Sequence, residues 1–216
     1  MTDGPIAVPV REGPCAACGK PGPFCVCAAI DPVPVRTRVL ILQHPQEKTE
    51  ILGTATIAAA QIAGANVRAG LSWRNLAAAL GREADARRWA VLYLGPAKAP
   101  EGLADGVVAV DKAGAALPDQ GAALAGLEGL VLLDGTWSQA KTLWWRNPWL
   151  LKCRRIVLFP KARSRYGTLR REPRREGLST IEAAAVALSR IEGDPTLEAR
   201  IVKPFEALLR KVRAGR

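Results

Sequence analysis

Residues 130–145 read LVLLDGTWSQAKTLWW, and this stretch indicates the fold most directly. Residues 130–133 are continuously apolar, as in a strand that is buried on both faces. The polar turn that begins at Asp134 follows at once, and residues 138–145 have helical character. The stretch therefore predicts a strand, a short turn and a helix, the repeating unit of a sheet with parallel strands.

The same alternation extends in both directions along the chain. Apolar runs bounded by turn residues predict further strands over 39–43, 89–94, 107–110 and 155–159. Helices are expected over 49–63 with Thr49 as N-cap, over 179–192, and at the C-terminus with Pro204 in the first turn. The predicted fold class is α/β, a mainly parallel sheet with helices on both faces. Ligands bind beyond the carboxyl ends of such strands, so Asp134 and the segment after Phe159 should lie at the ligand edge.

Length and composition limit the class of protein. The 216 residues suffice for one main domain with a small appendage, and we expect the division at 1–34 and 35–216. A hydrophobic share of 49% with 24% charged residues excludes collagen-like and disordered chains. We see no apolar run long enough to span a bilayer and no secretory signal, so we expect a cytoplasmic protein without membrane contact.

Positive charge is concentrated in the C-terminal third. Residues 1–140 carry 12 basic and 13 acidic side chains, whereas 141–216 carry 19 and 7. The segment 161–177 lacks apolar periodicity, which predicts an exposed basic loop. An arginine-rich composition throughout would be the alternative reading, but the clustering argues against it. A one-sided basic field favours a polyanionic partner such as nucleic acid.

Four cysteines lie close together near the N-terminus, in PCAACGKPGPFCVC (14–27). Two close pairs joined by a Gly/Pro-rich turn can wrap one tetrahedral Zn²⁺ ion, and a filled set of four ligands favours a structural role. A disulfide pair is the alternative, which a reducing cytoplasm disfavours. The predicted ligands are Cys15, Cys18, Cys25 and Cys27.

Several enzyme classes lack their motifs. His44 is the single histidine, which we interpret as a hydrogen-bonding structural group, and no GxGxxG or phosphate-binding loop occurs. Asp134 stands out instead, because a carboxylate that ends a buried strand needs partners. It could orient a ligand amine, accept a proton or, like Thr136, cap the next helix. Tryptophans at 137, 144, 145 and 149 could stack on bases, although core packing is the better interpretation for 144 and 145.

The stretch LRREPRREGLSTIEA (169–183) joins arginines to a helix start. Ser179 or Thr180 can cap this helix, with Glu182 completing a capping box. A helix N-terminus preceded by arginines is an anion site, suited to a carboxylate or a phosphate.

Taken together, HPQEKTEILGTA, DGTW, NPWL and LRREPRREGLSTIEA, in this order behind four cysteines, resemble the DTW-domain family of tRNA-uridine aminocarboxypropyltransferases. The resemblance covers about residues 14–192. It implies a fold similar to SPOUT methyltransferases, with a C-terminal trefoil knot that holds S-adenosylmethionine. It also implies transfer of the 3-amino-3-carboxypropyl chain to N3 of a tRNA uridine in the variable loop, with methylthioadenosine leaving.

On this resemblance, residues at the predicted ligand edge acquire roles. Asp134 would be the proton acceptor or would bind the amine of the donor, and Trp137 would wall the pocket or stack on the base. The catalytic set is Asp134, Thr136 and Trp137. The set that binds S-adenosylmethionine is Pro160, Leu178, Ser179, Thr180 and Glu182. The set that holds tRNA phosphates is Arg163, Arg165, Arg170, Arg171, Arg174 and Arg175.

Two other functions fit the same residues. A SPOUT-type RNA methyltransferase would differ only in which carbon of the sulfonium faces the nucleophile. A non-catalytic zinc-containing RNA-binding module would not need Asp134, but its arginines would set the affinity and its salt dependence. The carboxylate at a strand end favours an enzyme. The partners predicted are tRNA, with no protein partner inferred and the oligomeric state left open.

Overall fold

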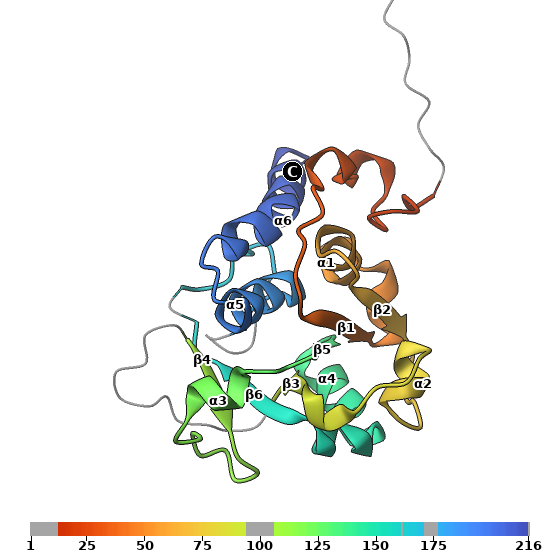
Figure 1. Cartoon of the computed structure of the whole chain (residues 1–216). Helices are drawn as coiled ribbons and strands as arrows, with labels where there is room; N and C mark the ends of the chain where they lie inside the picture. Colours follow the sequence, from red (N-terminus) through yellow and green to blue (C-terminus); the bar gives the residue numbers. More distant parts are fainter. Residues whose placement is uncertain (1–12, 94–105, 161, 171–176, 216) are drawn as a thin grey trace, which may run out of the picture.

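The computed structural model describes residues 13–93, 106–160, 162–170 and 177–215 (Figure 1). Within them, strands form a six-stranded sheet in the order β2-β1-β5-β3-β6-β4. Their bounds are β1 Arg38–Gln43, β2 Asn66–Ala69, β3 Trp89–Leu92, β4 Val107–Val110, β5 Gly129–Asp134 and β6 Arg154–Leu158. All neighbouring pairs are parallel except β4 with β6. The predicted α/β class with a mainly parallel sheet is confirmed, and β2 is a strand that the sequence analysis did not predict.

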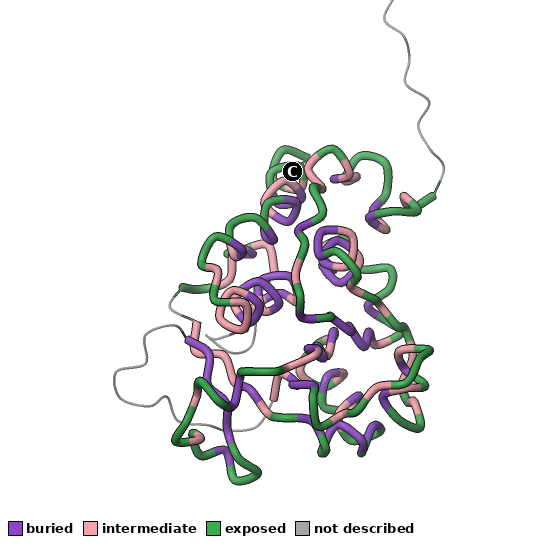
Figure 2. Tube along the Cα trace, viewed as in Figure 1, coloured by how far each residue is buried: buried purple, intermediate pink, exposed green. Residues whose placement is uncertain are grey.

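Helices cover both faces of the sheet (Figure 1). On one face α1 (Ala55–Gln61), α5 (Thr180–Glu192) and α6 (Leu197–Ala214) pack on alternate strand residues such as Leu130 and Leu132. The other face packs Val131 and its neighbours against α2 (Leu76–Leu80) and α4 (Trp137–Arg146). α3 (Gln120–Leu124) packs beside β4. β1 and β5 are therefore buried along most of their length (Figure 2), because successive side chains enter opposite cores.

The predicted helix over 49–63 is wrong in its first half. Residues Pro45–Thr49 form a short 3-10 helix, η3, and α1 begins only at Ala55. Between them, the carbonyls of residues 50, 52 and 53 accept hydrogen bonds from Lys20 and Tyr166 side chains. These carbonyls point to partners from distant segments, so the turn 50–53 cannot continue a helix. α5 begins at Thr180, one residue later than expected, and α4 begins at Trp137, one residue earlier than expected.

Pro204 lies inside α6, and its predicted place in the first turn is wrong. A proline within a helix leaves the carbonyl four residues earlier without its usual donor. Here the carbonyl of Arg200 accepts a hydrogen bond from Gln61 Nε2 at 2.8 Å. A side chain of α1 thus satisfies the group that Pro204 leaves unpaired, and the helix continues.

The basic segment is less exposed than its composition predicts. Within its described part, 162–170, Tyr166 is buried and its ring meets Phe205 of α6 edge to face, with centroids 5.0 Å apart. The prediction of an exposed loop is therefore wrong for Tyr166, which packs into the core. The prediction for Trp145 is also wrong, since 78% of its side chain is exposed, whereas Trp144 packs partly against Tyr93.

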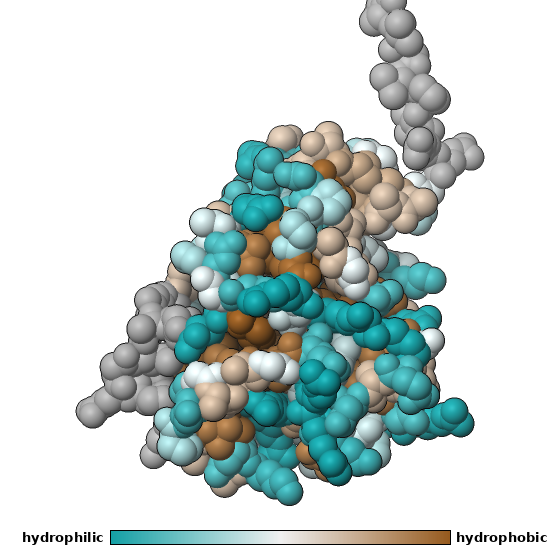
Figure 3. All heavy atoms as spheres, in the orientation of Figure 1, coloured by the Kyte–Doolittle hydropathy of each residue, from teal (hydrophilic) through white to brown (hydrophobic). Residues whose placement is uncertain are grey.

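The N-terminal segment lies on the helical layer formed by α1 and α6 (Figure 1). Cys18 and Val26 join the core that underlies these helices, and the Cys18 carbonyl accepts a bond from Thr56 Oγ1 at 2.8 Å. The division at residue 34 remains a prediction. Figure 3 shows hydrophilic side chains over much of the face drawn there, with apolar ones lying in recesses between them. Of the helices described, none combines the length and apolarity that crossing a membrane requires.

Candidate active site

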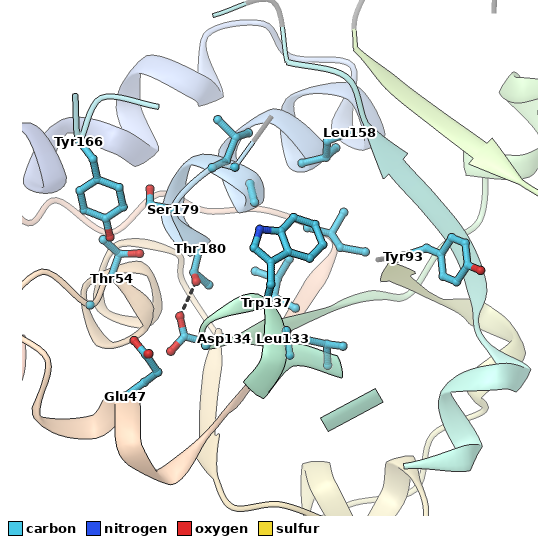
Figure 4. A pocket seen from close by; sticks show the side chains of 18 of the residues that line it. Glu47, Thr54, Tyr93, Leu133, Asp134, Trp137, Leu158, Tyr166, Ser179 and Thr180 are labelled. Carbon is cyan, nitrogen blue, oxygen red and sulfur yellow. Dashed lines mark hydrogen bonds between the residues drawn. The ribbon is translucent and has the colours of Figure 1, made fainter. Parts of the chain in front are cut away.

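A cavity of about 390 Å³ opens at the carboxyl ends of β3, β5 and β6. Its walls come from the ends of these strands, from η3, from the start of α4 and from the residues that lead into α5. Parallel strands that end at one edge leave such a hollow, because the connections diverge to opposite faces of the sheet. The cavity therefore lies where the sequence analysis placed the ligand edge (Figure 4).

Asp134 ends β5 in this cavity and is only 4% exposed. Its Oδ2 accepts a hydrogen bond from Gln43 Nε2 at 2.9 Å, and its Oδ1 accepts one from Thr180 Oγ1. Gln43 of the neighbouring strand β1 and Thr180 of α5 thus fix the orientation of the carboxylate. A carboxylate can accept about four hydrogen bonds, so the capacity for a ligand donor remains.

The turn after Asp134 explains the DGTW motif. Gly135 has φ +155°, and a Cβ at this position would lie 2.8 Å from Gln139 Cβ, so glycine is required. Thr136 is exposed and caps α4 in a capping box with Gln139, which is the alternative role that the sequence offered for it, and its place in the catalytic set stays a prediction. Trp137 then opens α4, and its indole stands at the cavity wall (Figure 4).

The predicted cofactor set divides in two. Leu178, Ser179 and Thr180 line the cavity, whereas Pro160 and Glu182 are not among the described residues that do so. Ser179 caps α5, and Glu182 completes the capping box as predicted. Glu182 also accepts from Ser164 Oγ at 2.7 Å and from the Arg165 backbone N–H at 2.8 Å. Its carboxylate therefore fastens the basic segment to α5.

The predicted RNA-binding arginines occupy different environments. Arg163 is exposed, and Arg165 forms ion pairs with Glu182 and Glu206. Arg170 lines the cavity and places Nη2 3.5 Å from Glu47 Oε2. Arg171, Arg174 and Arg175 lie outside the described residues.

Glu47 is a cavity residue that the sequence analysis missed. It is 5% exposed, belongs to η3, and its carboxyl group is directed toward the same part of the cavity as Asp134 (Figure 4). Burial raises the pKa of Glu47, and the Asp134 charge adds to this, while the Arg170 guanidinium opposes both. The available signal was the position of HPQE after a strand; His44 itself caps η3 through Nδ1, in agreement with the structural role predicted for it.

Gly53, the last residue of the turn 50–53, lines the cavity, and side chains of distant segments hold this turn. Tyr166 Oη donates to the Leu52 carbonyl at 2.6 Å. Lys20 Nζ donates to the carbonyls of Glu50, at 3.1 Å, and of Gly53. Next to this turn, Thr54 Oγ1 accepts from the backbone N–H of Ile181 at 3.2 Å. The cavity shape thus depends on the basic segment, on α5 and on the cysteine segment.

The four N-terminal cysteines come together as predicted. Their sulfurs all lie within 4.8 Å of one another, with Cys15 and Cys27 at 3.4 Å and Cys18 and Cys25 at 3.8 Å. A tetrahedral ion with Zn–S bonds of about 2.3 Å would separate sulfurs by about 3.8 Å. Backbone N–H groups of Cys18 and Ala17 lower the pKa of the Cys15 thiol to about 6. The cluster therefore fits a bound metal ion.

The Asn147–Trp149 part of the NPWL motif is explained by packing. Asn147 is fully buried at the end of α4, where Oδ1 accepts from Trp73 N and from Trp149 Nε1. Its Nδ2 donates to the carbonyls of Leu71 and Leu143. The motif therefore connects α4 to the loop before α2.

The sequence is similar to those of known proteins. The chain is 27% identical over 217 residues to tRNA-uridine aminocarboxypropyltransferase 2 of Macaca fascicularis, and the match covers 94% of the chain and 65% of that protein. The Drosophila melanogaster protein of the same name is 32% identical over 206 residues, with 93% and 75% covered. The chain thus spans about two thirds of the length of the mammalian relatives that it matches, including the one from Mus musculus. No solved structure matches the chain.

The match to a family model extends over nearly the whole chain. The DTW domain matches residues 13–213, which include the cysteine cluster, η3, the DGTW turn and both C-terminal helices. Because this match extends over nearly the whole sequence, the chain belongs to the DTW domain family.

Proposed function

We propose that this protein transfers the 3-amino-3-carboxypropyl group of S-adenosylmethionine to N3 of a uridine in tRNA. The observation that carries the proposal is the presence of opposite charges in one cavity. Asp134 and Arg170 both line it, Asp134 is buried, and Arg170 is three-quarters buried beside Glu47. The methionine end of the donor presents an ammonium group and a carboxylate, which such a pair complements.

The rest of the cavity suits the donor as well. Apolar side chains of the strand ends, including Leu92 and Leu158, offer surface for an adenosine, and the Trp137 indole lies across from Asp134 (Figure 4). Ser179 and Thr180 stand at the N-terminus of α5, where hydroxyl and N–H groups can hold a ribose or a carboxylate. The names of the relatives support aminocarboxypropyl transfer as the reaction.

The chemistry requires positioning above all. The uridine N3 must approach the Cγ carbon of the donor in line with the bond to sulfur, and fixed geometry is the main source of rate. In this scheme Asp134 holds the donor ammonium, Arg170 its carboxylate, and Trp137 the wall beside the reacting carbon. Pro160 and Glu182, which we assigned to the donor from sequence, would act by shaping the segment between β6 and α5.

The tRNA would approach the basic segment. The chain carries a formal charge of +11, and Arg163 is exposed beside the cavity-lining residues 166 and 170. Together with Arg165, Arg171, Arg174 and Arg175 it would contact phosphates, whereas Arg170 would face the donor. A variable-loop uridine and a cytoplasmic location belong to this proposal. So does the C-terminal SPOUT-type knot.

We further propose that the cysteine cluster holds one structural Zn²⁺. Four sulfur ligands leave no position for a substrate, and the cluster packs on α1 and α6. Elemental analysis should find about one zinc per chain, and Cys18→Ser should lose it together with thermal stability. An iron-free, zinc-free protein of unchanged stability would contradict this assignment.

Nucleoside mass spectrometry tests the function. Unmodified tRNA is incubated with the protein and S-adenosylmethionine, then digested. The proposal predicts a uridine heavier by the aminocarboxypropyl group and release of methylthioadenosine. Methylated uridine with S-adenosylhomocysteine would instead establish a methyltransferase, and tight tRNA binding without product would leave a binding module.

A further inference from the structure

A second groove adjoins the cavity, and the two share Glu47 and Arg170. The other walls of the groove come from residues 46–52, from the start of α4 and from Leu169. The cavity and the groove therefore meet at Glu47. If the donor fills the cavity, a second substrate that enters through the groove reaches it at this carboxylate.

The groove has the chemistry of a pyrimidine site. Gln46 and Gln139 face one another in it, with Nε2 of Gln139 donating to Oε1 of Gln46 at 3.0 Å. Gln139 Oε1 already accepts from the Thr136 backbone N–H, so the Gln46 carboxamide is the group that can offer a donor, and a second lone pair as acceptor, to the imide edge of uracil. Ile51 and Leu169 provide apolar surface for the faces of a ring, and 42% of Ile51 is exposed.

Glu47 differs from Asp134 in how the protein holds it. Both oxygens of Asp134 accept hydrogen bonds, from Gln43 and from Thr180. Glu47 is held instead by a cation, since Nη2 of the Arg170 guanidinium lies 3.5 Å from Glu47 Oε2. Burial raises the pKa of Glu47, Asp134 and Glu50 raise it further, and Arg170 lowers it. A carboxylate with a raised pKa is the better proton acceptor at neutral pH.

The geometry points to Glu47 as the catalytic base that removes the N3 proton of a uridine bound in the groove, an inference that rests on the proposed function. A Glu47 oxygen takes the proton, and the nitrogen electron pair forms the bond to Cγ of the donor. The Cγ–S bond breaks with its electron pair left on sulfur, so neutral methylthioadenosine leaves. Glu47 then returns the proton to water.

Glu47→Gln tests this role, because the amide keeps the shape but cannot accept the proton. Turnover under saturating substrates should fall by about 10²–10⁴-fold, while calorimetric affinity for S-adenosylmethionine stays unchanged. Glu83→Gln, the same change at an exposed residue after α2, should behave as wild type. The acid limb of the wild-type pH–rate profile should disappear in Glu47→Gln.

A tRNA transcribed with 5-fluorouridine separates proton removal from binding. Fluorine makes N3–H more acidic, so the reaction depends less on a base and the defect of Glu47→Gln should shrink. An equal defect on both tRNAs, or a loss of donor affinity that accounts for the defect, would overturn the role as base. Wild-type turnover in Glu47→Gln would overturn it too, with the transferase function intact. Absence of aminocarboxypropyl-uridine from the wild-type reaction would overturn the function and, with it, this role.

Discussion

Two regions of the molecule bury carboxylates to a similar degree but use them differently. Glu182, 2% exposed, accepts hydrogen bonds from Ser164, Ser179 and Arg165. Asp134, 4% exposed, and Glu47, 5% exposed, face a cavity instead. Burial alone therefore does not identify a site. A buried carboxylate whose acceptors are taken up by the protein stabilises the fold, whereas one that borders a cavity is available to a ligand.

The largest effect on activity is expected at Asp134, the cavity carboxylate that ends β5. Asp134→Asn should lower kcat/KM for S-adenosylmethionine by about 10³-fold, or about 4 kcal/mol, because the donor ammonium loses its counter-charge. Stability should change little, since Gln43 can turn its amide to meet the new group. Steady-state kinetics and thermal unfolding measure both. Wild-type kinetics in Asp134→Asn would make this carboxylate a structural group like Glu182.

Substitution of Glu182 should lower the stability of the protein and not its activity. Glu182→Gln removes the negative charge that pairs with Arg165 and accepts a hydrogen bond from the Ser179 backbone N–H. This loss should lower the free energy of unfolding by about 2–3 kcal/mol. Urea unfolding measures it. The matched control is Glu198→Gln, because the Glu198 side chain is 44% exposed and lies 3.9 Å from the same arginine. The control should change stability by less than about 1 kcal/mol, and an equal effect in both variants would refute the assignment.

Glu192 should make a smaller contribution to the free energy of unfolding, and this contribution should depend on pH. Burial alone would raise its pKa, but hydrogen bonds from Thr37 and Arg36 outweigh burial and lower it. A carboxyl group with a lowered folded pKa stabilises the protein above its unfolded pKa and loses this contribution as pH falls through the folded value. Glu192→Gln should therefore cost about 1 kcal/mol at pH 7 and progressively less in acid. A pH-independent difference in unfolding free energy would contradict the lowered pKa.

The smallest effect should come from the basic segment. Arg163→Ala should weaken tRNA binding by less than about 1 kcal/mol and reduce the slope of log K against log salt by about one. Arg170→Ala should instead raise the KM for S-adenosylmethionine, because Arg170 lines the cavity. Filter binding of tRNA across salt concentrations and steady-state kinetics with S-adenosylmethionine distinguish the two variants. Identical behaviour of the two variants would mean that both arginines serve the same ligand.

The sequence sufficed for the elements whose pattern is local. The apolar run before Asp134 and the capping residues Ser179 and Glu182 specify a strand end and a helix start through their immediate neighbours. The cysteine spacing likewise predicted a cluster that the structure shows. These predictions rest on groups a few residues apart.

What the sequence could not show depends on contacts between distant segments. Glu47 belongs to the site because η3 lies beside Asp134 and Arg170, which follow it by 87 and 123 positions. The turn 50–53 is not helical because Lys20 and Tyr166 occupy its carbonyls. Pro204 is tolerated inside α6 because Gln61 replaces the missing donor. The position of HPQE after a strand was the one local signal among these cases, and it did not show which distant residues Glu47 would meet.

A structure of the protein bound to S-adenosylmethionine would be the decisive test of the proposed transfer. The methionine end of the donor should lie between Asp134 and Arg170, with Cγ, and not the methyl group, directed toward Glu47 and the groove. A donor bound with its methyl group toward the groove would contradict aminocarboxypropyl transfer. A donor bound outside the cavity would contradict the site itself.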